Sequence, residues 1–274
     1  MSDNPEIGKS IQTGAFSTNY HDIGEGAPTL LIHGSGPGVT AFANWRLSFP
    51  VLSQKLRVLA PDMLGFGYTE RPDGVEYTLD TWVRHLIDFI DALGIDKVNL
   101  VGNSFGGALT LATSIRHPER VNRIVLMGAA GVKFDLTEGL DYAWGYTPSF
   151  ENMRKMLDLF AYDRSLVSDE LAQLRYEASL RPGVQDAYAS MFPAPRQQWI
   201  DALASDPADI ARIQAPALIM HGREDRILPY SNSTTLFELI PNAQLHLFGK
   251  CGHWTQIEHA RRFNALLLDF FTEE

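Results

Sequence analysis

The sequence predicts an α/β fold in which a mostly parallel sheet is flanked by helices and carries an inserted helical lid. Two observations predict this fold. In the first half of the chain, short apolar runs alternate with segments of helical periodicity, as in a parallel sheet covered on both faces. From residue 133 to residue 207 there is no strand-like run, and such runs resume only at residue 216. We therefore expect an α/β core made of residues 1–132 and 208–274, and a helical lid made of residues 133–207.

The expected strands are six short runs rich in aliphatic residues. Each is too short for a typical helix, and most end at glycine, proline or another turn-forming residue. They are Thr29–His33, Arg57–Pro61, Val98–Gly102, Arg123–Met127, Pro216–Met220 and Gln244–Phe248.

The expected helices are recognised by apolar residues that recur every three or four positions. The clearest runs from Thr78 to Leu93, where Thr78 can cap the start and Gly94 fits the C-terminal stop. Within the core we also expect helices over Asn44–Leu56, from Ser104 to about His117, and from about Gln256 onward. Four short helices are expected in the lid, at Asn152–Phe160, Asp169–Leu180, Gln185–Met191 and Arg196–Ala204.

The composition of the chain excludes several classes of protein. A single cysteine in 274 residues can form neither an internal disulfide nor a cysteine-rich metal site. A net charge of −10 argues against the basic face of a nucleic-acid binder and against docking on anionic membranes. The N-terminus has no secretory apolar segment, and no apolar run approaches the roughly 20 residues that span a bilayer. We expect a cytoplasmic protein whose partner is a small molecule, without nucleic acid or membrane.

The strongest local motif is Gly102-Asn-Ser-Phe-Gly106, which matches G-x-S-x-G between an expected strand and an expected helix. In that context the motif is typical of a nucleophile elbow, a sharp turn that exposes the serine hydroxyl. Small residues at Gly102, Gly106 and Gly107 allow the close backbone approach that the turn needs. Ser104 is therefore the candidate nucleophile.

A serine nucleophile needs a base, and the base needs an orienting carboxylate. Asp225 and His253 each follow one of the last two expected strands, so they should emerge at the same sheet edge as Ser104. Glu224 competes with Asp225 for the acid role, and we prefer Asp225 from its place in the motif. Cys251 lies close to His253 in sequence, but we do not expect it to act as a nucleophile.

The glycine-rich run from His33 to Gly38 follows the first expected parallel strand. Its exposed backbone N–H groups can stabilise a developing oxyanion, so we assign the amides of Ser35 and of Phe105 to an oxyanion hole. His33 itself is interpreted as structural. The run lacks the Gly-Lys-Ser/Thr of a phosphate loop, and the chain contains no H-E-x-x-H, so we expect no metal and no cofactor.

Together these motifs resemble the α/β-hydrolase fold family over nearly the whole chain. At finer grain the chain is similar to the meta-cleavage product hydrolases, which hydrolyse a carbon–carbon bond in 2-hydroxy-6-oxohexa-2,4-dienoates formed from catechols. The segments that carry this resemblance are His33–Gly38, Asn44–Arg46, Pro61–Gly67, Gly102–Gly107, Leu174–Ala178, Met191–Arg196 and Lys250–Trp254.

The resemblance implies further roles. Arg175 matches the arginine with which the family binds the substrate carboxylate, and a guanidinium fork suits a carboxylate beside a 2-oxo group. Asn44 and Asn103 match polar groups near the same end of the dienoate, and Trp254 matches a tryptophan that walls the substrate beside the base. The implied reaction is ketonisation of the dienol followed by Ser-His-Asp-assisted hydrolysis at C6. The products are 2-hydroxypenta-2,4-dienoate and a carboxylic acid.

The substituent on C6 should be held by an apolar pocket. We expect its walls to be Ala130, Leu140, Trp144, Ile200, Ile227 and Leu228. The small Ala130 beside larger neighbours favours an aldehyde, methyl or small alkyl group over an aryl group.

Several alternatives stay open at this point. A carboxylesterase or another serine hydrolase of the same fold would share Ser104, Asp225 and His253 without needing Arg175. A ligand receptor on the same fold would bind without turnover. If the chain is a carbon–carbon bond hydrolase, the sequence does not distinguish a mechanism with an acyl-enzyme on Ser104 from one with a gem-diol intermediate. The resemblance suggests a homodimer or a higher homo-oligomer.

Overall fold

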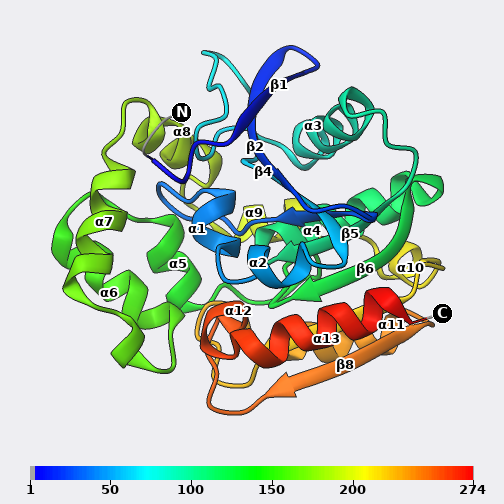
Figure 1. Ribbon diagram of the computed structural model, residues 1–274. Coiled ribbons are helices and arrows are strands. Elements are labelled where there is room, and N and C mark those ends of the chain that lie inside the picture. The colour runs from blue at the N-terminus through cyan, green and yellow to red at the C-terminus, as the bar shows by residue number, and fades with distance from the viewer. Residues whose placement is uncertain (1–3, 274) are drawn as a thin grey trace.

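The computed structural model describes residues 4–273, and its eight strands form a single sheet (Figure 1). The strand order across the sheet is β1-β2-β4-β3-β5-β6-β7-β8. The pairs β1–β2 and β2–β4 are antiparallel, and the other neighbouring pairs are parallel. This confirms the predicted α/β fold with a mostly parallel sheet. The strands are β1 Lys9–Thr13, β2 Phe16–Ile23, β3 Ala27–Ile32, β4 Leu56–Pro61, β5 Val98–Asn103, β6 Val121–Met127, β7 Ala217–Gly222 and β8 Ala243–Phe248.

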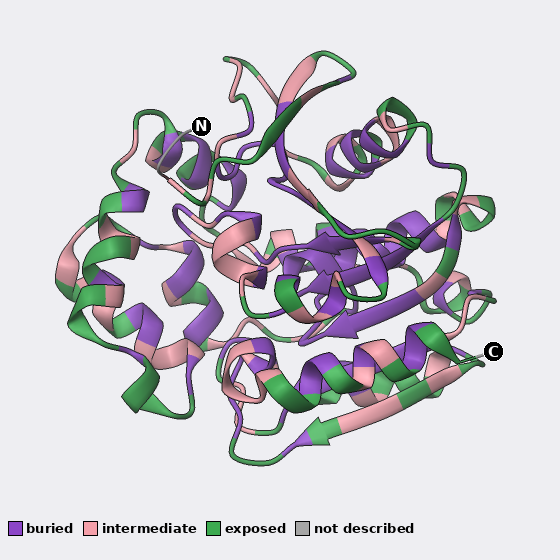
Figure 2. Cartoon of the chain, viewed as in Figure 1, coloured by how far each residue is buried: buried purple, intermediate pink, exposed green. Residues whose placement is uncertain are grey.

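Successive side chains of a strand point to opposite sides of the sheet, and the central strands are buried on both faces because helices cover both sides. In β3, Leu30 and Ile32 join one hydrophobic cluster with residues of the helices α3 Leu79–Ala92, α4 Phe105–Arg116 and α11 Ser231–Leu239. Leu31 joins a second cluster with residues of α1 Ala41–Trp45, α2 Phe49–Leu52 and α13 Ala260–Thr272. The middle of the sheet and α4 are accordingly buried in Figure 2.

The helix α3 ends and begins as the sequence predicts. The Thr78 hydroxyl oxygen accepts a hydrogen bond from the backbone N–H of Thr81, which satisfies one of the unpaired amides of the first turn. Gly94 follows the helix with a φ of 65°, a conformation that favours glycine.

One expectation for the N-terminal third of the core was wrong, and two strands there were missed. The single helix expected over Asn44–Leu56 is replaced by α1 and α2, and Leu56 already begins β4. Pro50 explains the break, because proline lacks an N–H and is tolerated only in the first turn of a helix, which is its place in α2. The strands β1 and β2 were not predicted, since an edge strand such as β1 is short, polar and largely exposed.

The helices between residues 133 and 206 are α5 Glu138–Trp144, α6 Phe150–Phe160, α7 Asp169–Ser179, α8 Val184–Met191 and α9 Gln197–Leu203, with a 3₁₀ turn at Arg164–Leu166. Residues 128–216 contain no strand. The last four helices lie close to their predicted bounds, whereas α5 was missed. The arrowheads of β6 and β8 point toward the side of the molecule where α5, α6 and α7 lie (Figure 1). The division into a core of residues 1–132 and 208–274 and a lid of residues 133–207 stays a prediction.

The remaining elements are α10 Pro207–Ile210, α12 Thr255–Glu258 and a 3₁₀ turn at Pro118–Arg120. The expected C-terminal helix is thus divided into α12 and α13 around His259. Among residues 4–273 no helix is both long enough and apolar enough to cross a bilayer.

Candidate active site

Ser104 stands alone between β5 and α4, in a backbone conformation that side-chain-bearing residues rarely adopt. Its φ is 55° and its ψ is −116°. Three backbone hydrogen bonds hold it there: its N–H donates to Met127 (2.9 Å), and its carbonyl accepts from Gly107 (2.9 Å) and Ala130 (3.0 Å). Strain held by its surroundings is typical of a functional residue, and the geometry matches the strained turn expected of a nucleophile elbow.

The turn depends on glycine at two positions. A Cβ atom on Gly102 would lie 2.2 Å from the Gly106 oxygen, and one on Gly106 would lie 2.4 Å from the Ile32 oxygen. Neither distance leaves room for a side chain. The glycines therefore allow β5, α4 and the end of β3 to approach closely enough to form the turn.

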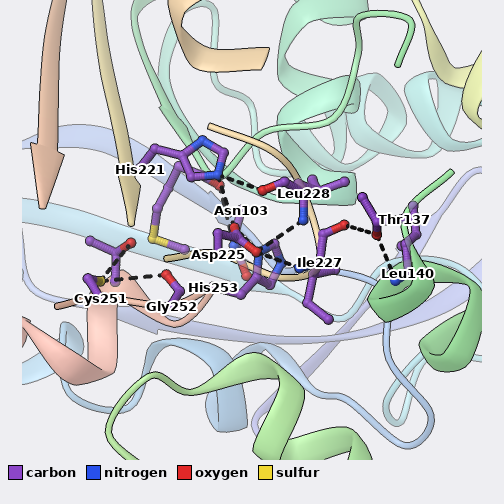
Figure 3. A network of polar contacts seen from close by, with 12 residues as sticks. Asn103, Thr137, Leu140, His221, Asp225, Ile227, Leu228, Cys251, Gly252 and His253 are labelled. Carbon is purple, nitrogen blue, oxygen red and sulfur yellow. Dashed lines mark hydrogen bonds and ion pairs between the residues drawn. The ribbon is translucent and has the colours of Figure 1, made fainter. Parts of the chain in front are cut away.

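Asp225 and His253 meet at the carboxyl edge of the sheet, as their positions after β7 and β8 predict (Figure 3). The Nδ1 atom of His253 lies 2.6 Å from Oδ2 of Asp225, and both side chains are almost fully buried. Ser104 and His253 line the same cavity. The structure thus brings the three residues to one edge of the sheet.

The carboxylate of Asp225 is held by donors on both oxygens. Oδ1 accepts from the backbone N–H groups of Ile227 (2.7 Å) and Leu228 (3.0 Å), and Oδ2 faces His253 and His221. Burial alone would raise the pKa of Asp225, but electrostatic attraction to the His253 and His221 imidazoles and the hydrogen bonds from them hold that pKa well below its usual range. Asp225 therefore stays ionised beside the imidazole.

Glu224, the competing acid, points to a different partner. Its carboxylate accepts from the backbone N–H of Cys251 (3.1 Å) and from the Arg223 guanidinium (2.7 Å). Those two hydrogen bonds lower the pKa of Glu224. Glu224 thus supports the loop that carries His253, while Asp225 contacts the imidazole.

Cys251 is fully buried below His253. Burial raises the pKa of its thiol to about 12, so the sulfur stays protonated and is a poor nucleophile. The lone cysteine packs in the loop that presents the histidine.

A cavity of about 830 Å³ opens beside Ser104 and His253. The predicted polar residues Asn44, Asn103 and Arg175 line it, and so does Trp254. The Trp254 ring packs against Phe160 of α6, with ring centres 5.6 Å apart. The Asn103 side chain is buried and donates weakly to the Met127 carbonyl (3.4 Å).

Arg175 lies on α7 and points into this cavity, but Glu6 already occupies one side of its guanidinium. Nη2 of Arg175 lies 2.6 Å from Oε1 of Glu6, and only 13% and 12% of the two side chains are exposed. Arg46 and Arg181 line the same region of the cavity, and Nη1 of Arg181 lies 3.8 Å from Glu6. Within the described residues, Nη1 of Arg175 and Nδ2 of Asn44 are buried without a hydrogen-bond partner.

Sequence reasoning missed Arg46 and Arg181, which together with Arg175 form an arginine cluster along the cavity, and it missed Glu6, which pairs with Arg175. Arg46 had a local signal, since it follows Asn44 in one of the segments that carry the family resemblance. Glu6 had none, because it lies in the N-terminal segment before β1 and meets Arg175 only in the folded chain.

The two residues assigned to the oxyanion hole, Ser35 and Phe105, line one small cavity together with Ser104. Phe105 is the first residue of α4, where backbone N–H groups have no partner within the helix. Ser35 follows β3, and its hydroxyl accepts a hydrogen bond from Nε1 of Trp144 (3.1 Å). Ser35 and Ser104 line the large cavity and also a second, smaller one.

The second cavity holds only about 10 Å³, which is roughly the room for one water molecule. Five of the six residues predicted for the C6 pocket line it: Ala130, Leu140, Trp144, Ile200 and Leu228. Phe134 and Leu203 line it as well and were not predicted. Ile227 is buried elsewhere, with its side chain against Gly139, while its backbone N–H donates to Asp225.

Comparison with known proteins identifies the same fold family and, within it, enzymes that are similar to this chain over nearly its whole length. The family model described as alpha/beta hydrolase fold matches residues 28–260. The chain is 60% identical over 271 residues to the 2-hydroxy-6-oxo-2,4-heptadienoate hydrolase of Pseudomonas putida, covering 99% of this chain and 98% of the relative. It is also 60% identical over 269 residues to the 2-hydroxymuconate semialdehyde hydrolase of Pseudomonas sp. (strain CF600), covering 98% and 95%.

A solved structure is equally similar. A variant of the meta-cleavage product hydrolase CumD from Pseudomonas fluorescens IP01, complexed with acetates, superposes with a TM-score of 0.97 at 62% identity, covering 98% of both chains. The chain therefore belongs to the α/β hydrolase fold family and, within it, to the meta-cleavage product hydrolases, enzymes that hydrolyse a carbon–carbon bond.

Proposed function

We propose that this enzyme hydrolyses 2-hydroxy-6-oxohexa-2,4-dienoates that carry a small group on C6, with Ser104, His253 and Asp225 as its catalytic triad. The observation that supports this most is that Ser104 lines two cavities that differ in their charged lining residues. Arginines and asparagines line the larger one, while the smaller one is lined by Ser35, Ser104 and apolar side chains. A dienoate has the matching asymmetry, with a carboxylate at one end and a C6 substituent at the other.

The polar end of the substrate binds in the arginine cluster. Arg46, Arg175 and Arg181 outnumber the carboxylates of Glu6 and Glu177 that line the same cavity, so its charged lining is net positive in a chain whose net charge is −10. Nη1 of Arg175 and Nδ2 of Asn44 are the buried donors that a carboxylate and a 2-oxygen would satisfy. Leaving such groups unpaired costs about 1–3 kcal/mol each, which ligand binding would recover.

The reaction adds the elements of water across the C5–C6 bond. Ketonisation of the dienol first moves a proton from the 2-hydroxyl to C5. When the C5–C6 bond later breaks, C5 leaves as part of a stabilised dienolate, which takes up a proton to give 2-hydroxypenta-2,4-dienoate. Attack on the C6 carbonyl then gives an oxyanion that the N–H groups of Ser35 and Phe105 stabilise. An acyl-enzyme on Ser104 and a water-derived gem-diol both pass through this oxyanion, and His253 moves the proton in either route.

The apolar end of the substrate binds between Ser104 and α5. The residual cavity there holds about one water molecule, so a hydrogen or a methyl group on C6 fits and a phenyl group does not. The names of the two relatives above describe these same two substrates, a C6 aldehyde and a C6 methyl ketone.

The test is an assay of the purified protein with three dienoates that differ only on C6: 2-hydroxymuconic semialdehyde, its 6-methyl homologue and the 6-phenyl compound. Loss of visible absorbance measures turnover. We expect kcat/KM for the first two to exceed that for the phenyl compound by at least about 100-fold. Release of p-nitrophenol from esters without turnover of any dienoate would instead indicate a carboxylesterase, and binding without turnover a receptor.

We propose further that the enzyme acts in the cytoplasm as a homodimer or a higher homo-oligomer, as the family resemblance suggests. Light scattering during size-exclusion chromatography gives the mass of the particle. A mass equal to one chain of 30.5 kDa would contradict this proposal.

A further inference from the structure

A second histidine contacts the carboxylate of Asp225. His221 belongs to β7 and is fully buried. Its Nε2 lies 3.0 Å from Oδ2 of Asp225, the same oxygen that faces His253 at 2.6 Å (Figure 3). Two imidazoles therefore share one carboxylate oxygen, although a triad needs only one of them.

The surroundings of His221 determine which ring nitrogen carries the proton. Nε2 faces two acceptors, Oδ2 of the ionised Asp225 and the carbonyl oxygen of Leu228 at 3.1 Å. Neither can donate, so Nε2 must carry a hydrogen. Nδ1 faces the hydroxyl of Ser233 at 2.7 Å, which can donate. The neutral tautomer with a proton on Nε2 satisfies every one of these contacts.

The consequence is a carboxylate with no remaining freedom. Oδ1 of Asp225 accepts two backbone N–H groups and Oδ2 accepts two imidazole N–H groups. Four donors occupy the roughly four lone-pair sites that a carboxylate offers. Asp225 therefore cannot rotate away from His253, and Nδ1 of His253 is kept protonated, which leaves its Nε2 as the base.

We propose that His221 is a positioning residue, which acts through Asp225 to fix the tautomer and the orientation of His253, and that Ser233 fixes His221 in turn. This inference rests on the triad of the proposed function. His221 touches no substrate, since it does not line either cavity beside Ser104.

The first test observes the tautomer directly in the unmodified enzyme. In an imidazole ¹⁵N–¹H correlation spectrum of histidine-labelled protein at pH 7, His221 is expected as the neutral Nε2–H form, assigned by loss of its signals in His221→Gln. The Ser233→Ala variant removes the donor to Nδ1 and should shift those signals. An Nδ1–H form or an imidazolium at this position would overturn the proposal.

The second test separates hydrogen bonding from packing. His221→Leu fills the space with an apolar side chain and removes the hydrogen-bond donor to Asp225. We expect kcat to fall by about tenfold or more, with KM changed less than about twofold. His221→Gln places an amide N–H near the same point and should keep kcat within about threefold of the unmodified enzyme. Equal kcat in the Leu and Gln variants would refute a positioning role.

A matched control is His85→Leu, which removes another buried histidine whose Nε2 contacts Thr18 and which lines neither cavity beside Ser104. It should lower stability without changing kcat of the folded protein. If the unmodified enzyme turns over no dienoate, the proposed function fails, whereas normal turnover together with an unaffected His221→Leu variant overturns only the role of His221. Should the Leu variant not fold, the tautomer and the Ser233→Ala shift decide the matter.

Discussion

The chemistry of this site depends on which partner each side chain contacts. Asp225 and Glu224 are neighbours in sequence, yet one contacts the His253 imidazole and the other a backbone amide of its loop. Arg175 is both the expected anion ligand and one half of an ion pair with Glu6. The role of each residue thus follows from contacts that its type alone does not reveal.

The acid of the triad can be assigned by comparing two isosteric substitutions. Asp225→Asn removes the charge that stabilises the His253 imidazolium, and kcat should fall by about 10³–10⁴. Glu224→Gln should leave kcat within about threefold, because Glu224 contacts only the loop backbone and Arg223. Steady-state kinetics on the 6-methyl dienoate measure both, and the opposite ranking would reject Asp225.

The anion-binding role of Arg175 predicts an effect on substrate affinity. Arg175→Gln removes a charged donor from the cavity, so KM for the dienoate should rise by about 10- to 100-fold with a smaller change in kcat. Hydrolysis of an uncharged p-nitrophenyl ester should be unaffected. Arg212→Gln, at an exposed ion pair with Asp209, is the matched control and should change neither activity. An unchanged KM in Arg175→Gln would place the carboxylate elsewhere.

The size of the small cavity predicts a change of specificity at Ala130. Ala130→Val adds two methyl groups beside a space that holds about one water molecule. The ratio of kcat/KM between the C6 aldehyde and the 6-methyl ketone should therefore rise by about 10-fold or more. If this ratio stays the same, Ala130 does not line the substrate pocket.

At the scale of elements, the loops after β7 and β8 are tied to the helices between β6 and β7. The Thr137 hydroxyl caps α5 by accepting a hydrogen bond from the backbone N–H of Leu140, and it donates one to the Ile227 carbonyl (Figure 3). The next backbone N–H along the chain, that of Leu228, donates to Asp225. The backbone N–H of His253 donates to the Phe160 carbonyl at the end of α6 (2.7 Å). The proposed lid thus takes part in holding the triad.

The carboxylate of Glu258 on α12 alone accepts three backbone hydrogen bonds between these segments. Its carboxylate accepts from the backbone N–H groups of Gly252 (2.7 Å), Tyr162 (2.9 Å) and Asp163 (2.8 Å), joining the His253 loop to the segment after α6. Glu258→Ala should lower the free energy of unfolding by about 1–3 kcal/mol, because it leaves these amides without an ionised acceptor. Urea titration measures this loss, and the exposed Glu238→Ala on α11 should show less than about 0.5 kcal/mol.

At the scale of the whole molecule, stability should depend on pH through buried histidines. Burial lowers the pKa of His33 and of His85 from 6.5 to about 4. Between these values the unfolded chain binds more protons than the native chain, so each histidine stabilises the fold above pH 6.5 and loses that contribution as the pH falls toward 4. Burial raises the pKa of Asp62 to about 6, which acts in the opposite direction over part of this range.

Two histidines against one carboxyl predict a net loss of stability in acid. From the pKa shifts of His33, His85 and Asp62, the free energy of unfolding should fall by about a few kcal/mol between pH 7 and pH 4.5. His85→Gln should make this pH dependence shallower, since one of the two titrating groups is gone. Urea titrations at several pH values measure the slope, and an unchanged slope in His85→Gln would contradict the assignment.

Much of the fold could be predicted because its signals are local. The Thr78 cap and the apolar spacing of α3 depend on residues within one turn of each other, and so do the aliphatic runs that became central strands. The exceptions are also physical. Pro50 interrupts a helical pattern that the apolar spacing alone would continue, and the exposed strand β1 lacks the burial that produces a readable pattern.

The sequence by itself determined the order of the strands from β3 to β8, most of the helices that follow them, the strained serine turn, and the emergence of Asp225 and His253 at one sheet edge. These follow from local patterns and from the rule that the carboxyl ends of parallel strands meet at one edge. Only the tertiary structure decided that Asp225 rather than Glu224 contacts His253, that Glu6 pairs with Arg175, and that His221 shares the carboxylate. Such contacts depend on the direction of each side chain to within an ångström, and packing between distant segments sets that direction.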